Sequence, residues 1–315
     1  FPYTTLFLSL NYKKGDGFRP NSDFNSYNLY SYLDYRLSEK IKLSFEFTYL
    51  DYFAHQPGGL TDAMFYDNIY QSNRERNWFD IKWLLYNIQA NYTISEGTKL
   101  SVNALILDAH RRSVGFRTNR VDQVDSFGER DLISAEFNNF SVESKLMHHH
   151  KPFNQKTTSL IGSRLYLGSN SSQQGPGSDG FDANFNFQSD LYPNYENQSY
   201  YENPNLNFAI FNENIIYLND KMAITPGVRF EYIKTMSDGY YRNINTDAAD
   251  NVILNELIMT DEIRERQFIL LGLGYSFKIV DWSEFYSNCS QNYRAVTFAD
   301  INTINPNFII NPSIS

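Results

Sequence analysis

The fold is decided by the stretch from Tyr27 to Tyr49, which reads YNLYSYLDYRLSEKIKLSFEFTY. On both sides of a short turn at residues 37–40, apolar and aromatic side chains recur at every second position, with Ser31 as the exception. The positions between them carry hydrogen-bonding or charged side chains, from Asn28 to Thr48. Because successive side chains of a strand point to opposite faces, this pattern predicts an antiparallel hairpin with one apolar and one polar face.

The length of these two strands distinguishes a membrane wall from a soluble β-sandwich. Strands of a soluble sandwich usually span about five or six residues. These runs span about ten to twelve, which is the length of a tilted strand that crosses a bilayer. Tyrosines lie toward the ends of the apolar face and aliphatic side chains in its middle, as in the aromatic girdles of outer-membrane barrels. The hairpin therefore favours a transmembrane β-barrel.

The composition agrees with this interpretation and excludes other classes. Tyr (24) and Phe (25) are abundant among the 315 residues, and no run of about eighteen apolar residues predicts a transmembrane helix. The formal net charge of −9 argues against a nucleic-acid partner. A single cysteine, Cys289, excludes an intramolecular disulfide and a cysteine-rich metal site. The chain begins at Phe1 without a signal peptide, so we expect it to be part of a longer protein.

The alternating pattern predicts eleven strands, whose connections alternate in length. The strands are expected at residues 3–13, 24–36, 41–51, 79–93, 98–109, 137–148, 158–167, 205–218, 222–234, 265–278 and 284–294. Brief turns follow residues 36, 93, 148, 218 and 278, whereas long polar segments follow residues 13, 51, 109, 167 and 234. Short periplasmic turns and long external loops are typical of bacterial outer-membrane barrels. The orientation of the strand at 205–218 stays open, because it is apolar on both faces.

Eleven strands do not close a barrel of the ordinary bacterial type, which has an even number of strands. We therefore expect an open, curved sheet with two unpaired edges, all-β and antiparallel with up-and-down topology.

Several motifs resemble TonB-dependent outer-membrane receptors of the ferric dicitrate type. They are GDGFRPNSDF at 15–24, QPGGLTD at 56–62, QSNRERNWF at 71–79, FNEN at 211–214, TPGVRFEY at 225–232 and SQNYRAVTFADI at 290–301. The stretch at 225–232 resembles the superfamily generally, and the stretches at 57–62 and 73–79 resemble its ferric-citrate-like branch. The resemblance spans nearly the whole chain.

The resemblance implies a receptor in the bacterial outer membrane for energy-coupled uptake of a ferric chelate similar to ferric citrate. Its barrel would have about 22 strands and hold an N-terminal plug, on which a TonB-type energy-coupling protein acts from the periplasm. Residues 1–315 would then be a partial barrel, with the plug domain and the C-terminal strands absent from this chain. The implied partners are the ferric chelate, outer-membrane lipid, the plug and the coupling protein.

Arginines of the long loops are the candidate ligand contacts, because a planar guanidinium pairs bidentately with the carboxylates of such a chelate. We favour Arg74, Arg76 and Arg117, which lie just outside predicted strand ends. The alternative is that each pairs with loop acids. On the inner face, Arg229 and Glu231 are expected to hold the barrel wall against the plug.

Neither a metal site nor an enzyme is predicted. The run of His148, His149 and His150 lies at a predicted short turn, and adjacent strand residues point to opposite faces, so three imidazoles do not converge. The acidic residues bracket no cleft, Cys289 has no partner for nucleophilic catalysis, and glycine-rich phosphate loops are absent from the sequence. The pattern gives no reason to expect a cofactor.

Two further classes of protein share the alternation. One is a passive barrel of the porin or fatty-acid type, which would lack a plug. The other is a soluble extracellular all-β binding module, which would stay in solution without detergent.

Overall fold

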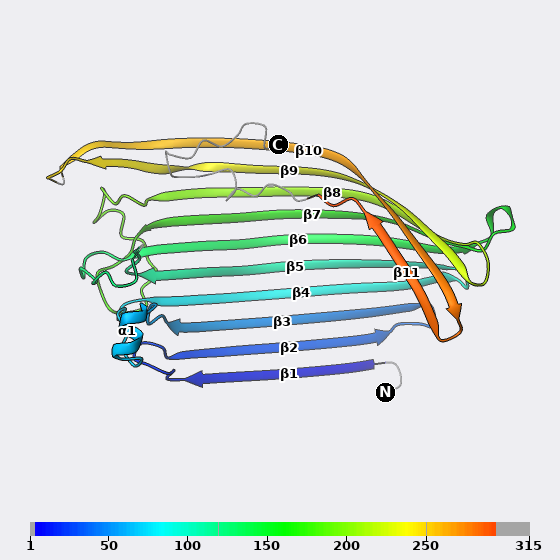
Figure 1. Ribbon diagram of the computed structural model, residues 1–315, viewed down its shortest axis with the longest axis horizontal. Helices are drawn as coiled ribbons and strands as arrows, with labels where there is room; N and C mark the ends of the chain where they lie inside the picture. Colours follow the sequence, from blue (N-terminus) through cyan, green and yellow to red (C-terminus); the bar gives the residue numbers. More distant parts are fainter. Residues whose placement is uncertain (1–3, 119, 250, 294–315) are drawn as a thin grey trace.

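The computed structural model describes residues 4–118, 120–249 and 251–293, which form one antiparallel sheet of eleven strands in chain order (Figure 1). The strands are β1 (Thr4–Gly15), β2 (Phe24–Arg36), β3 (Ile41–His55), β4 (Trp78–Ser95), β5 (Thr98–Gly115), β6 (Asp131–His150), β7 (Thr157–Pro176), β8 (Ser199–Tyr217), β9 (Met222–Thr246), β10 (Val252–Val280) and β11 (Ser283–Ser290). A helix, α1 (Asp62–Asp67), and a 3-10 turn, η1 (Pro152–Asn154), lie in connections. The predicted up-and-down all-β fold is confirmed. No helix among the described residues is long and apolar enough to cross a membrane.

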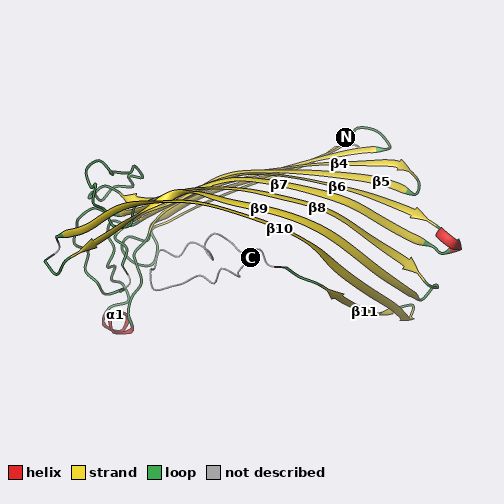
Figure 2. Cartoon of the chain, turned by 90° about the horizontal axis from the view of Figure 1, so that it is seen from above, coloured by secondary structure: helices red, strands yellow, loops and turns green. Residues whose placement is uncertain are grey.

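The outer face of the sheet, defined as the side that carries Leu29 and the residues in register with it, is apolar. Leu29 pairs with Leu10 on one side and with Tyr49 on the other, and Tyr49 pairs with Leu84. The described strands form a single curved layer (Figure 2). On this face Leu43, near the start of β3, is 37% exposed. An apolar face that no protein layer covers is the face that a membrane barrel turns to lipid.

The inner face, on the opposite side, is polar and hydrogen-bonded. Asp34 on β2 accepts a hydrogen bond from Ser44 Oγ (2.9 Å) and pairs with Lys42 Nζ (3.1 Å) across the β2–β3 ladder. The register also orients β8, which the sequence left open. Ile210 lies on the outer face and Phe211 on the inner face.

The short turns gather at one end of the sheet and the long loops at the other, as predicted (Figure 1). In the turn between β2 and β3, Ser38 Oγ accepts hydrogen bonds from the backbone N–H groups of Lys40 (3.3 Å) and Ile41 (3.1 Å). In the long β3–β4 loop, Thr61 caps α1, since its Oγ1 accepts from the backbone N–H of Met64 (3.3 Å). Local side-chain hydrogen bonds thus define connections at both ends.

The strands extend further than predicted toward the long loops. We expected a long loop between residues 234 and 265, and this expectation is wrong. β9 and β10 stay paired from Lys234 opposite Glu265 to Thr246 opposite Val252. Outside the hydrocarbon band both faces of a strand can be polar, so the alternation ends while the backbone pairing continues.

At the other end of the chain, the predicted last strand at 284–294 is shorter, since β11 ends at Ser290. The end of the predicted strand, at residue 294, and the end of the last resemblance motif, at residues 294–301, lie outside the described residues.

The inner wall is closely packed where a glycine faces an aromatic ring. A Cβ atom added to Gly162 on β7 would lie 2.3 Å from Cζ of Phe211 on β8. The guanidinium carbon of Arg229 on β9 lies 5.1 Å from the centroid of the same ring. Gly162 is therefore required for Phe211 to lie flat on the wall and support Arg229.

Candidate functional site

Buried charged residues tie three of the long loops together at one end of the sheet. We call this group the loop cluster, and its members are Arg74, Arg76, Asp125 and Arg130. Arg76 is fully buried, and its Nε and Nη2 donate to the two carboxylate oxygens of Asp125 (2.9 and 2.6 Å). Its Nη1 donates to the backbone oxygens of Gly128 (3.0 Å) and Asp179 (2.7 Å). One guanidinium thus joins the β3–β4, β5–β6 and β7–β8 loops.

Arg130, at the end of the β5–β6 loop, is also fully buried and acts in the same way. Its Nε donates to the backbone oxygen of Ser178 (2.8 Å), and its Nη1 donates to those of Arg76 (3.0 Å) and Asp182 (2.7 Å). Buried carbonyl groups need donors. The two arginines therefore supply, across loops, the hydrogen bonds that strand pairing supplies elsewhere in the sheet.

The single carboxylate of the loop cluster lies among its three guanidinium groups and pairs with that of Arg76. Burial opposes ionisation of Asp125, but hydrogen bonds from Arg76 and from the backbone N–H of Phe127, with the charges of Arg76 and Arg74, hold its pKa below the ordinary value. Burial lowers the pKa of the Arg74 and Arg130 guanidinium groups. Asp125 therefore stays ionised at neutral pH.

Arg74 is 5% exposed and contacts loop backbone. Its Nη1 donates to the backbone oxygens of Asn73 (2.6 Å) and Gln123 (3.1 Å), and its Nη2 donates to that of Val121 (3.3 Å). Of the three arginines favoured as ligand contacts, Arg74 and Arg76 thus hold loops in place.

A polar cavity of about 420 Å³ lies on the inner face beside the loop cluster, and we call it the mouth pocket. It is lined by Arg117, Thr118, Asp131, Ile133, Gln174, Tyr195 and Asn197. Asp131, the first residue of β6, is its buried centre. It accepts hydrogen bonds from Arg117 Nη1 (3.0 Å), Gln174 Nε2 (3.0 Å) and the Tyr195 hydroxyl (2.7 Å). Two strands and two loops therefore meet at one carboxylate.

The mouth pocket keeps donors available for a ligand. The Arg117 side chain is 49% exposed and donates to Asp131 through Nη1, which leaves the rest of the guanidinium facing the cavity. Burial, and then the charge of Asp131, raise the pKa of Tyr195, so its hydroxyl stays protonated. That proton is donated to Asp131, so the guanidinium of Arg117 is the group that can donate hydrogen bonds to a carboxylate-bearing ligand.

The predicted plug-facing pair lies on the inner face of β9, further down the wall. Arg229 Nε and Glu231 Oε1 form an ion pair, and Glu231 Oε2 accepts from Asn207 Nδ2 (3.0 Å). Glu231 is buried. With Arg164 and Tyr166, the pair lines a hollow of about 270 Å³.

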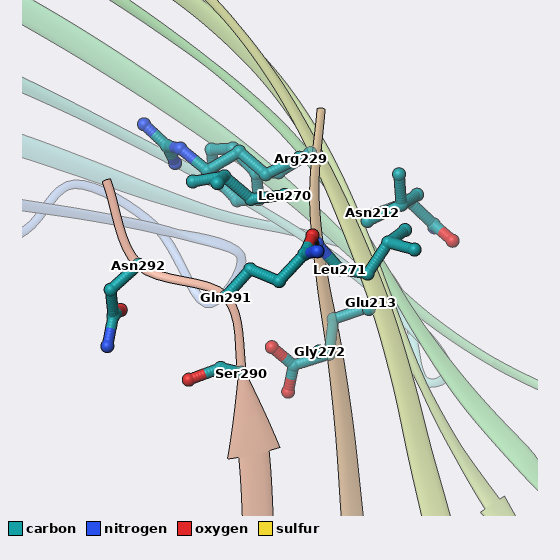
Figure 3. Close-up of a pocket in the computed structure, with 12 residues that line it drawn as sticks. Asn212, Glu213, Arg229, Leu270, Leu271, Gly272, Ser290, Gln291 and Asn292 are labelled. Atoms are coloured by element: carbon teal, nitrogen blue, oxygen red, sulfur yellow. Dashed lines mark hydrogen bonds between the residues drawn. The ribbon is translucent and has the colours of Figure 1, made fainter. Parts of the chain in front are cut away.

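Another hollow, of about 330 Å³, lies where the chain leaves β11 (Figure 3). Ser290, Gln291 and Asn292 line one side, and Leu271 and Gly272 of β10 line another. The Gln291 backbone N–H donates to the Leu271 oxygen (2.9 Å), and Gln291 Oε1 accepts from the Leu271 N–H (3.0 Å). Leu271 faces outward and Gly272 inward, so this hollow straddles the sheet edge. The mouth pocket is the better candidate site.

Among the described residues, no group of three or more His, Cys, Asp or Glu side chains is arranged to hold a metal ion. Asp131, Gln174 and Tyr195, which build the mouth pocket, were missed in the sequence. The nearest signal was position, because Asp131 and Gln174 flank the long loops beside Arg117. Nothing in the sequence brings Tyr195, near the end of the β7–β8 loop, to that carboxylate.

Residues 11–314 match a family model described as "TonB dependent receptor-like, beta-barrel". No curated protein matches the chain. Among solved structures, the ferric citrate transporter FecA in its unliganded form has a TM-score of 0.70 at 16% identity, over 90% of this chain and 38% of that chain. The open form of the ferric-catecholate import receptor Fiu from E. coli K12 has a TM-score of 0.67 at 9% identity, over 92% of this chain and 50% of that chain. The ferric yersiniabactin uptake receptor FyuA from Yersinia pestis has a TM-score of 0.63 at 10% identity, over 91% of this chain and 42% of that chain.

At these identities the likeness to solved structures establishes the fold alone. The chain spans half or less of the length of each of these three structures.

Proposed function

Because the chain belongs to the TonB-dependent receptor-like β-barrel family, whose members are outer-membrane transporters rather than enzymes, we propose that its protein imports a ferric chelate with exposed carboxylates, similar to ferric citrate. The observation that carries this proposal is the mouth pocket, where Arg117 faces a polar cavity beside ordered loops. The fold likeness to the ferric citrate transporter FecA is consistent with this ligand class. Because members of this family are outer-membrane proteins, the alternative of a soluble extracellular binding module is excluded.

In this proposal the favoured arginines have two roles. Arg117 binds a ligand carboxylate, while Arg74 and Arg76 fix the loops that enclose it. A half-exposed guanidinium exchanges water for ligand oxygens, whereas a buried one would have to give up bonds that it already makes. Gln174 and Tyr195 hold Asp131, which in turn orients Arg117.

Calorimetry of the full-length protein in detergent with ferric citrate tests this assignment. Replacing Arg117 with alanine should weaken binding about 10- to 100-fold, the cost of one or two charge-assisted hydrogen bonds. Arg120→Ala is the matched control, because Arg120 lies in the same loop and pairs with Asp122 (3.0 Å) in solvent. Heat from another chelate or a glycan, but none from ferric citrate, would exclude this ligand and leave transport standing. Equal affinity of Arg117→Ala and wild type would remove the mouth pocket as the site.

The remaining proposals concern the completion of the barrel, its plug and its energy coupling. We propose that residues 1–315 form part of a barrel that is completed by other strands and filled by a plug, on which a TonB-type protein acts. Arg229 and Glu231 would then contact the plug from the wall. Uptake of radiolabelled ferric citrate by cells with and without the proton gradient separates energy-coupled import from a passive pore. Uptake that persists unchanged after the gradient is collapsed would contradict coupling.

A further inference from the structure

Two imidazoles lie together on the outer face of the sheet at the short-turn end. His148 and His150, two residues apart on β6, have ring centroids 5.2 Å apart and an interplanar angle of 27°. His149 lies on the opposite face, where its Nδ1 is 2.8 Å from Thr158 Oγ1. The alternation that keeps three adjacent imidazoles apart therefore brings the first and the third together.

A hydroxyl group fixes the proton on the ring of His150. Its Nε2 lies 2.8 Å from Ser159 Oγ, and Ser159 Oγ donates to Asn214 Oδ1 (2.6 Å). The hydroxyl has a single proton, which Asn214 accepts, so Nε2 of His150 is the donor to Ser159. The lone pair of His150 is then on Nδ1.

His148 is held from the other side by β5. Its Nδ1 lies 2.9 Å from Thr98 Oγ1, which also accepts a hydrogen bond from Ser95 Oγ (3.1 Å). A hydroxyl oxygen accepts two hydrogen bonds, so His148 can donate through Nδ1 and keep its lone pair on Nε2. Both rings then offer one unprotonated nitrogen on the same face of the sheet.

From this geometry we propose that His148 and His150 chelate a divalent d-block cation, with Cu²⁺ bound most tightly. Two imidazole nitrogens at about 2.0–2.1 Å from one ion place the ring centroids about 4.5 Å apart at a square angle and about 5 Å apart at a tetrahedral angle. The observed separation of 5.2 Å is close to this range, so a small rotation of the rings brings them to a square site. Imidazole suits Cu²⁺, which heads the affinity order of these cations and accepts nitrogen and oxygen ligands in a square arrangement. Among the described residues no third side chain completes the set, so water fills the remaining positions.

The hydroxyl groups behind the rings are part of the proposed site. Hydrogen bonds to the far nitrogen of a ligating histidine fix its tautomer and its ring orientation. Replacing Ser159 with alanine should therefore lower copper affinity about tenfold while both histidines still bind. Ser159 is a positioning residue, and a spectrum with two bound nitrogens separates its role from direct ligation.

Copper titration of the full-length protein in detergent, followed by electron paramagnetic resonance, tests the proposal. We expect one Cu²⁺ with two equatorial imidazole nitrogens. His148→Ala and His150→Ala should each lower affinity at least about tenfold and remove one nitrogen from the spectrum. His149→Ala is the matched control, because it removes the same group from the same run on the opposite face, and its affinity and spectrum should equal those of wild type.

Three results would overturn the proposal. They are no copper binding by wild type, two imidazole nitrogens retained in His148→Ala or His150→Ala, and a loss in His149→Ala as large as that in its neighbours. The last result would mean that copper binding to the histidine run does not depend on His148 and His150 sharing one face of the strand. Heat-modifiable gel migration confirms that each variant is folded, and His148→Asn and His150→Asn replace any alanine variant that is not.

Discussion

Replacing Arg76 with alanine should open the loops beside the mouth pocket and leave the sheet paired. The Asp125 side chain, 7% exposed, would stay buried without the guanidinium that holds both of its oxygens. The backbone oxygens of Gly128 and Asp179 would lose their shared donor. These losses fall on contacts between loops, because the strands are held by their own ladders.

The magnitude follows from the cost of leaving one partner of a buried ion pair without the other, about 3–5 kcal/mol. A free-energy change of about 1.4 kcal/mol is a tenfold change in an equilibrium constant. Amide exchange through loop opening should therefore accelerate by about two to four orders of magnitude. Loop exchange in Arg76→Lys should be faster than in wild type and slower than in Arg76→Ala, because lysine keeps the charge but cannot pair bidentately.

Hydrogen–deuterium exchange of the full-length protein in detergent measures this effect on peptides from residues 116–130 and 177–198. Arg120→Ala is the control, since its ion pair with Asp122 is exposed and contributes little. Loop exchange in Arg76→Ala equal to that of wild type would refute the role given to the loop cluster. Acceleration that spreads through β5, β6 and β7 would mean that Arg76 supports the wall rather than the loops.

Three further outcomes are expected. Ile88→Lys should destabilise the barrel by about 2–4 kcal/mol, because this outer-face side chain lies in the middle of the apolar band. Gln89→Lys on the inner face should not destabilise it. Urea unfolding of the two variants in lipid vesicles measures the difference. Gly162→Ala should cost about 1–3 kcal/mol in the same assay, because its Cβ would meet the ring of Phe211, and Phe211→Leu in the same chain should recover part of the loss. Because the fold lowers the pKa of Asp125, the stabilisation from its ionised form is complete above the ordinary carboxyl pKa of about 4 and is lost as pH falls below it. Loop exchange, corrected for its intrinsic pH dependence, should rise only below about pH 4.

The wall could be predicted from the sequence because the membrane imposes a repeating constraint. Lipid on one side and water on the other require alternation, so Leu43 and Lys42 were assigned to opposite faces correctly. The same reasoning failed for the outer parts of β9 and β10, between residues 234 and 265, where the alternation ends but the strands stay paired. It also could not orient β8, whose outer Ile210 and inner Phe211 are both apolar.

The loops could not be predicted, because their contacts have no period. Arg76 binds the backbone of residues about fifty and one hundred positions away, and any residue type can supply such carbonyl groups. Tyr195 reaches Asp131 in the same irregular way. Proximity to a strand end therefore identified arginines at the mouth but did not separate those that hold loops from those that face the cavity.

Burial and the existing hydrogen bonds distinguish the arginines that hold loops from the arginine that faces the cavity. Arg76 has its donors occupied and its surface covered, so a ligand oxygen near it would replace a bond rather than add one. In the proposed site Arg117 would give up water instead, and Asp131 already holds its side chain in place. Since the wall is shared by receptors for different cargo, ligand preference in this protein should follow the residues around Asp131, and exchanging those residues should change the ligand without changing the sheet.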